Sequence, residues 1–188
     1  HPDLMDRMAA IRPLYGNGGE VLRKIRDPKL LADCLTRADV NFSVPEIRDS
    51  ISPLDANKQW LRKPRRSSGG LGIRRARLNE ERESGVNHYY QEQVPGDACS
   101  AVFLADTSGC RQLGFTEQQS GVPGLPDQPF LYAGSATSNL RRNVDWQYRE
   151  WLEELGSLLA RGFGLRGLFT LALVGDYWLP AVKPRYRA

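Results

Sequence analysis

The sequence predicts an α+β fold, in which helices and a mostly antiparallel set of strands follow one another along the chain. Apolar residues recur at three- and four-residue spacing near the start and again between 145 and 162, as in amphipathic helices. The remaining segments are short alternating or apolar runs bounded by Gly and Pro, as strands are. Their order lacks the regular strand-helix alternation of a doubly wound sheet.

Residues 1–43 are predicted to be a helical lead-in segment. Its first helical stripe consists of Leu4, Met5, Met8 and Ile11. The run "GNGG" at 16–19 interrupts this pattern, and a second helical pattern extends from Val21 to Leu35. Within it, Asp27 followed by Pro28 is typical of an N-cap with Pro at the first helical position.

Residues 44–95 are predicted to form a subdomain of strands. The extended piece "VPEIR" leads through the polar turn "SISPLDAN" to the strand "QWLRKP", which Pro64 ends. After the loop "SSGGLG", the run "NHYYQEQV" at 87–94 alternates aromatic and polar residues until "PG" stops it.

Residues 96–188 are predicted to form a second, larger subdomain. The strands "CSAVFLAD" and "CRQLGFTEQQ" are joined by "TSG" as a hairpin, and the Pro- and Gly-rich segment 121–129 is a loop. Asp145 is predicted to cap a helix that ends at Gly162 and Gly164. One face of that helix carries Trp151, Leu155 and Leu159. The strands "GLFTLALV" and "YWLPAV" then close the chain.

Composition excludes several classes of protein. A length of 188 residues with 40% hydrophobic content suits one main domain, and no run approaches the roughly 18 apolar residues of a membrane span. Cys34, Cys99 and Cys110 are an odd count without metal-ligand spacing, which favours reduced thiols in a cytoplasmic protein. His1 and His88 are the two histidines, too few for a zinc site or a Ser-His-Asp triad.

The basic run "RKPRRSSGGLGIRRAR" at 62–77 holds no acidic residue, although the net charge of the chain is only +4. Such a patch attracts phosphate. It also fits a solvated cationic loop that the following "EERE" compensates. A nucleic-acid binder would need stacking aromatic residues or a recognition helix, and the run contains neither, which argues against nucleic acid as a partner.

The centre of this run has the elements of a phosphate cradle. A strand ends near Lys63, and the small residues that follow let backbone N–H groups approach an anion. These residues are Ser67, Ser68, Gly69, Gly70 and Gly72. The pattern is neither a Walker loop nor a dinucleotide fingerprint, and a plain hairpin turn would also explain it.

Several motifs, taken together in their order along the chain, indicate a family resemblance. "KPRRSSGGLGIR", "YYQEQVPG", "SAVFLAD", "GLRGLF" and the ending "PRY" occur in this order. The series resembles the central and C-terminal ATP-binding portion of the ATP-grasp superfamily, especially its carboxylate-amine ligase-like members, over residues 2–188. The resemblance implies two α+β lobes with a nucleotide cleft between them. It makes 44–95 the lid subdomain with its glycine-rich loop and 96–188 the core subdomain.

The resemblance also implies site residues. Lys63 corresponds to a strand lysine that contacts the α- and β-phosphates, Gln91 to a residue that faces the adenine amino group, and Arg185 to a catalytic arginine on the γ-phosphate or acyl phosphate. The lid loop corresponds to Ser68, Gly69, Gly70 and Gly72, and the backbone hydrogen bonds of the hinge to Glu92 and Val94. Another family lysine would fall at Pro28, a departure from the pattern, although Lys29 is adjacent.

The family's magnesium ligands are missing. In the family, Asp, Glu and Asn oxygens hold the ions that bridge the ATP phosphates, and the matching positions here are Ala172, Ala181 and Lys183. Magnesium requires hard oxygen donors, which neither a methyl group nor an ammonium group provides. The matching positions therefore predict ATP as cofactor but no magnesium ligand from these three residues.

Two functions stay open on this basis. One is ATP-dependent ligation of a carboxylate to an amine through an acyl phosphate, the family's activity. The other is a degenerate, non-catalytic nucleotide-binding protein with a scaffolding or regulatory role. A nucleotide, a carboxylate and an amine are the partners that the resemblance implies, and a homodimer is open. Both a fragment of a longer protein and a naturally reduced relative fit the extent of the match.

Overall fold

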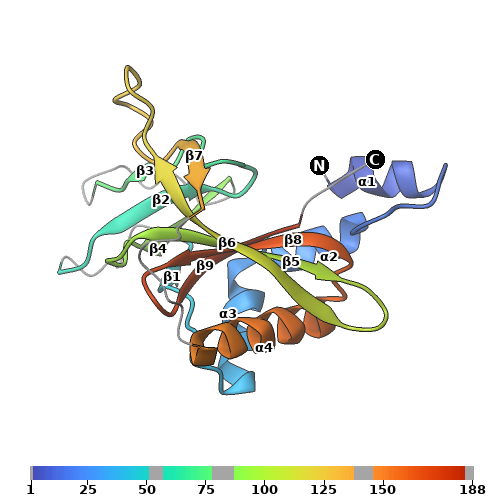
Figure 1. Ribbon diagram of the computed structural model, residues 1–188. Helices are drawn as coiled ribbons and strands as arrows, with labels where there is room; N and C mark the ends of the chain where they lie inside the picture. The colour runs from blue at the N-terminus through green and yellow to red at the C-terminus, as the bar shows by residue number, and fades with distance from the viewer. Residues whose placement is uncertain (1, 51–56, 78–86, 138–145, 185–188) are drawn as a thin grey trace.

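The computed structural model describes residues 2–50, 57–77, 87–137 and 146–184, and it confirms the α+β class (Figure 1). The described helices are α1 (Pro2–Ala9), α2 (Gly19–Ile25), α3 (Pro28–Ala38) and α4 (Trp146–Phe163). The described strands form two antiparallel sheets, which we name the lid sheet and the core sheet. Among the described helices, none combines the length and the apolar character that a membrane crossing requires.

The lid sheet has the strand order β1-β4-β2-β3. Its strands are β1 (Ile47–Arg48), β2 (Trp60–Pro64), β3 (Arg74–Arg75) and β4 (His88–Glu92). Lys63 pairs with Tyr89 and Leu61 pairs with Gln91, so these four side chains share one face. On the other face, Trp60 and Tyr90 form a small buried cluster with Ala76 against it.

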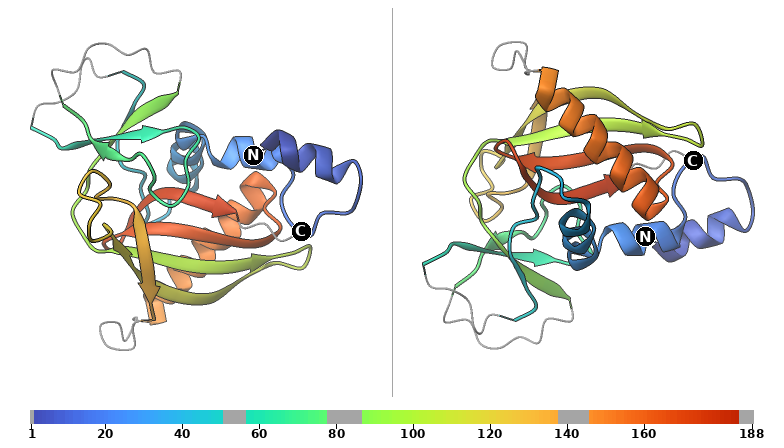
Figure 2. Two further views of the ribbon diagram at one scale, coloured as in Figure 1. Left: turned by 90° about the horizontal axis from the view of Figure 1, so that it is seen from above. Right: turned by 90° about the horizontal axis from the view of Figure 1, so that it is seen from below.

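The core sheet has the strand order β7-β6-β5-β8-β9. Its strands are β5 (Ala98–Ala105), β6 (Cys110–Ser120), β7 (Tyr132–Ala136), β8 (Gly167–Val174) and β9 (Trp178–Pro184). Helix α4 lies across one face of this sheet, with α3 near it, as the view from below shows (Figure 2). The opposite face of the core sheet, which α4 does not cover, faces the lid sheet.

The main hydrophobic core fills the space between the core sheet and the helices. Leu152, Leu155 and Leu159 of α4 are fully buried against it, at about 1.5–3 kcal/mol for each such side chain. The rings of Phe103 and Phe169 stack with centroids 5.2 Å apart. A Cβ atom at Gly156 would lie only 2.4 Å from the Phe103 ring, so glycine lets α4 approach the sheet closely.

The lead-in segment is fastened to the core sheet rather than separate from it. The Asn17 side chain, which is 1% exposed, accepts a hydrogen bond from Arg166 N and donates one to Arg166 O, both at 2.8 Å. Leu31 and Leu35 of α3 belong to the main core. The predicted N-cap is confirmed, because the Asp27 side chain accepts a hydrogen bond from Lys29 N at 2.9 Å.

Most predicted strands are present, with differences at their ends. The sequence predicts that the final strand ends at Val182, but the strand extends to Pro184, which places Lys183 within it. The short β3 and the strand β7 were not predicted as separate elements. The lid sheet spans residues 47–92 and the core sheet 98–184, and the proposed boundaries after residues 43 and 95 stay predictions. The predicted cap Asp145 lies outside the described residues.

Candidate functional site

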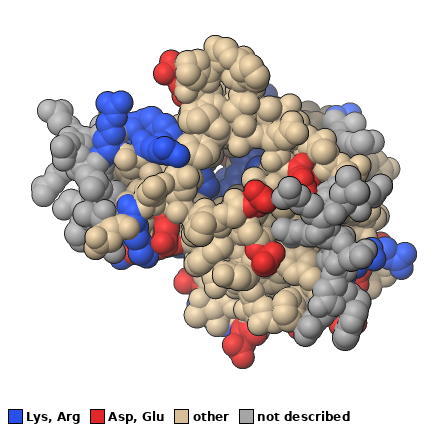
Figure 3. Space-filling model, turned by 60° about the vertical axis from the view of Figure 1, so that its left-hand side comes forward, with Lys and Arg blue, Asp and Glu red and all other residues tan. Residues whose placement is uncertain are grey.

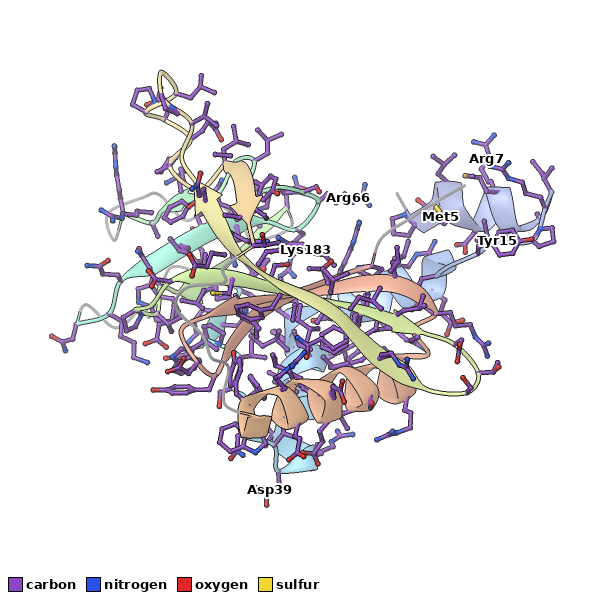
Figure 4. All side chains as sticks on the ribbon, in the orientation of Figure 1. Met5, Arg7, Tyr15, Asp39, Arg66 and Lys183 are labelled. Carbon is purple, nitrogen blue, oxygen red and sulfur yellow. The ribbon has the colours of Figure 1, made fainter. Side chains whose placement is uncertain are left out.

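The candidate site lies between the lid sheet and the face of the core sheet opposite α4. In the space-filling view a hollow opens in the surface, and Lys or Arg atoms are visible at its bottom (Figure 3). The side chains that enter this region from the lid sheet include Lys63 and Gln91, which share a face across β2 and β4. From the core sheet, Lys183 of β9 lies on the side away from α4 (Figure 4).

Lys63 is held by a hydrogen bond within the lid sheet. Its Nζ atom donates to Gln91 Oε1 at 2.5 Å. Burial of the ammonium group, and secondarily the positive charge of Lys183, lower the pKa of Lys63 from 10.5 to about 8. The protein alone therefore stabilises the charged form of Lys63 poorly. An anion beside the ammonium group would raise its pKa back toward the ordinary value.

Gln91 connects the two sheets. Its side chain is 1% exposed, and its Nε2 atom donates a hydrogen bond to Pro180 O of β9 at 3.4 Å. The oxygen end of the same amide accepts the hydrogen bond from Lys63. The amide thereby fixes Lys63 relative to the core sheet. The adenine-facing role of Gln91 stays a prediction, and in this structure both ends of the amide have protein partners.

The predicted hinge residues follow directly along β4. Glu92 N donates a hydrogen bond to Glu46 O at 2.8 Å, which joins β4 to the segment before β1. The Glu92 carboxylate lies 3.3 Å from Lys58 Nζ and is 20% exposed. Val94 is partly exposed in the connection between β4 and β5. Hydrogen bonds from Glu92 and Val94 to an adenine stay predictions.

The glycine-rich loop adopts a backbone that suits glycine. Gly69, Gly70 and Gly72 have φ angles of 62°, 79° and 72°, in the left-handed region that side chains rarely adopt. Leu71 N donates to Ser68 O at 3.2 Å, which closes a turn within the loop. The glycines predicted for a phosphate cradle are thus required by the local backbone geometry as well.

The loop is docked on residues 128–132, which precede and begin β7. Tyr132 N donates to Gly69 O at 2.7 Å, and Gly72 N donates to Gln128 Oε1 at 3.2 Å. At Gly70 the chains approach so closely that a Cβ atom would lie 1.8 Å from Phe130 O. Sequence reasoning missed this partner, because the Pro-rich composition of 121–129 indicates a loop but not what the loop contacts.

The positions that the sequence resemblance matches to metal ligands lie close together in the core sheet. Ala172 pairs with Ala181, and Lys183, two residues farther along β9, pairs with Thr170 of β8. Leu171 and Val182, which neighbour these positions along the strands, belong to the hydrophobic core. Because side chains alternate between the two faces of a strand, Ala172, Ala181 and Lys183 face the lid sheet instead. Ala172, Ala181 and Lys183, which are predicted to correspond to metal ligands, thus share one face of the sheet.

This face does not fit magnesium. Strands β5, β8 and β9 contain no acidic residue, and Ala172, Ala181 and Lys183 offer no side-chain oxygen. Across the described ranges of the chain, no cluster of three or more His, Cys, Asp or Glu side chains could hold a metal ion. The predicted catalytic Arg185 lies outside the described residues.

Lys29, the candidate for the family's other lysine, is engaged elsewhere. Its ammonium group pairs with the Asp49 carboxylate, which also lies 2.7 Å from Arg65 Nη2. The hydrogen bond from Lys29, followed by that from Arg65, lowers the pKa of Asp49 below its ordinary value. The Arg65 guanidinium also lies over the Tyr89 ring at 5.6 Å. These contacts occupy part of the predicted basic run.

Comparison with solved structures shows which proteins share this fold. A protein from Archaeoglobus fulgidus assigned to the ATP-grasp superfamily has a TM-score of 0.69 and 20% identity, with 97% of this chain and 53% of that chain covered. Biotin carboxylase from Campylobacter jejuni, in a structure described as a β-γ-ATP complex, has a TM-score of 0.70 and 14% identity, with 100% and 47% covered. These likenesses show the fold.

D-alanyl-alanine synthetase A from Vibrio cholerae is similar in the same way, with a TM-score of 0.70, 11% identity, and 97% of this chain and 62% of that chain covered. The chain spans about half the length of the first two of these relatives. No curated protein sequence matches it. The sequence profile of the ATP-grasp domain matches residues 25–175, most of the chain. On this match and the shared fold, the chain belongs to the ATP-grasp family.

Proposed function

We propose that the chain binds ATP in the hollow between the lid sheet and the core sheet, with the polyphosphate beside Lys63. The observation that carries this proposal is that Gln91 bonds both Lys63 of β2 and Pro180 O of β9, three residues before Lys183, which brings lysines from both sheets to one region. A polyphosphate is the ligand of matching charge. The glycine-rich loop, which begins a few residues after Lys63, serves as its lid.

The electrostatics of Lys63 favour an anionic ligand. An ammonium group whose pKa has dropped to about 8 gains stability when a phosphate oxygen approaches it. The hydrogen bond to Gln91 fixes the group without neutralising it, because an amide carries no charge. A charge-assisted hydrogen bond to phosphate contributes about 1.5–3 kcal/mol.

The proposal is binding without phosphoryl transfer. Carboxylate-amine ligation is the activity that family membership suggests, but phosphoryl transfer depends on cations that neutralise charge on the moving oxygens. The residues that face the hollow from β8 and β9 include no carboxylate and no side-chain amide to hold such a metal ion. A nucleotide-dependent scaffolding or regulatory role therefore agrees best with the side chains present.

The test is ATP affinity measured by calorimetry for the unmodified chain, for Lys63→Ala and for Arg75→Ala. Arg75 is a cation of the same basic run, exposed on β3. We expect Lys63→Ala to weaken binding about tenfold or more, because it removes a charged hydrogen bond, and Arg75→Ala to change it much less. Thermal melting of each variant controls for loss of the fold.

Two results would overturn the proposal. If the unmodified chain binds neither ATP nor ADP, the hollow is not a nucleotide site. If both substitutions weaken binding equally, diffuse attraction to the basic run explains the affinity, and the cradle around Lys63 does not.

A further inference from the structure

The core-sheet face of the hollow combines two small apolar side chains with a cation. Ala172 and Ala181 lie opposite each other in the β8–β9 pairing, and Lys183 lies two residues farther along β9 on the same face. Ala172 is 8% exposed, so its methyl group is covered rather than open to water. The small side chains leave Lys183 as the charged group that β9 presents on this face.

The ammonium group of Lys183 comes close enough to the lid sheet to act on Lys63. Its positive charge is one of the two causes that lower the pKa of Lys63. The lid sheet itself is held against β9 by the hydrogen bond from Gln91 Nε2 to Pro180 O, three residues before Lys183. Strand register and this contact both place Lys183 on the face of the core sheet toward the lid sheet, on the side shown in Figure 4.

We propose that Lys183 makes this a site for the metal-free form of a nucleoside triphosphate, with its ammonium group against the phosphate oxygens. The proposal rests on the proposed function, namely that ATP binds between the sheets. Lys183 is then a specificity-determining residue, which selects free ATP over its magnesium complex.

Charge explains the expected selectivity. Free ATP carries more negative charge than its magnesium complex, and two lysines attract the more negative ligand more strongly. A magnesium ion on the phosphates would bring a divalent cation next to Lys183 and Lys63. Ala172 and Ala181 provide no oxygen ligand to compensate that repulsion. The absence of side-chain oxygens from Ala172 and Ala181 and the presence of Lys183 therefore act in the same direction.

The experiment compares ATP affinity in the presence of a chelator with that in saturating magnesium, at constant ionic strength, by calorimetry. We expect the unmodified chain to bind ATP about tenfold tighter with the chelator. Lys183→Met should weaken binding of free ATP about tenfold and remove most of the difference between the two conditions. Lys24→Met is the matched control, because Lys24 is an exposed lysine of α2 paired with Glu20, and it should leave both affinities unchanged.

A gain-of-function variant tests the same idea from the other side. The triple variant Ala172→Asp, Ala181→Glu, Lys183→Asn restores the oxygen ligands of the family pattern and removes the competing cation. It should reverse the preference, so that ATP binds more tightly with magnesium than with the chelator. Unchanged preference in a folded triple variant would show that these three positions do not determine it.

The remaining outcomes separate the two proposals. Equal or tighter binding of the magnesium complex by the unmodified chain would overturn the selectivity and leave nucleotide binding intact. An unchanged ratio of affinities in Lys183→Met would likewise contradict the role of Lys183. Absence of ATP binding under both conditions would overturn the proposed function, and the selectivity with it.

Discussion

Lys63 should change its protonation when a nucleotide binds. In the free protein its pKa is about 8, so above pH 8 most molecules have lost this proton. The phosphate stabilises the ammonium form, so binding near pH 9 should take up close to one proton, and binding near pH 7 almost none. Affinity should fall by up to about tenfold for each pH unit above 8. Calorimetry in buffers of different ionisation enthalpy measures this uptake directly.

Lys63→Met is the control for this prediction. The variant has no amine to protonate, so the excess uptake near pH 9 should disappear while uptake from other groups stays. Equal uptake at pH 7 and pH 9 in the unmodified chain would show that Lys63 does not meet the phosphates.

The residue scale also shows what the sequence could and could not predict. The position of Lys63 at a strand end before the glycine-rich loop follows from the local pattern "RKPRRSSGG" and is confirmed. The contact of Gln91 with Pro180 joins residues 89 positions apart in the chain, and no local pattern encodes it. The tertiary contact, rather than the motif, determines which way the Gln91 amide is held.

At the scale of elements, docking of the glycine-rich loop should depend on Gly70. Alanine at this position would adopt φ 79° at a cost of about 1–2 kcal/mol, and its Cβ would overlap Phe130 O. Gly70→Ala should therefore release the loop from residues 128–132. If the loop covers the nucleotide, dissociation of a fluorescent ATP analogue should become about tenfold faster, as stopped-flow fluorescence can measure.

Gly124→Ala is the matched control. Gly124 has φ 86°, so the backbone strain is similar, but a Cβ atom added there would meet no atom within 4 Å and would add no clash. Similar dissociation rates for the two variants would mean that backbone strain alone matters. The contact between the glycine-rich loop and residues 128–132 would then not affect how long the nucleotide stays bound.

Elements with strong periodic patterns were predictable, and those formed by pairing alone were not. The apolar run of β8 and the stripe of α4 were identified from sequence, although the buried Leu152 was not among the residues assigned to that stripe. The strand β7, with the sequence "YAGSA", has small residues and mostly exposed side chains. It is a strand because β6 offers it an edge to pair with, which only the folded sheet provides.

At the scale of the whole molecule, the predicted α+β class and ATP-grasp fold are confirmed, with the described strands in two consecutive sheets. The order of motifs along the chain sufficed for this, because the two sheets are consecutive in the sequence. The attachment of the lead-in helices was not predictable in the same way. The two hydrogen bonds between the Asn17 side chain and the Arg166 backbone join the start of the chain to the residue just before β8. The sequence "GNGG", which contains Asn17, indicates only a break between helices.

The central claim is that a nucleotide binds between the two sheets, and hydrogen exchange with and without ATP tests it most directly. We predict slower exchange on ATP addition in two segments at once, residues 63–72 of the lid side and β9 on the core side. Helix α1, which contacts α2 and lies away from the lid sheet in Figure 1, should exchange equally in both conditions. Protection confined to residues 63–72, or equal exchange everywhere with ATP at saturation, would contradict binding between the sheets.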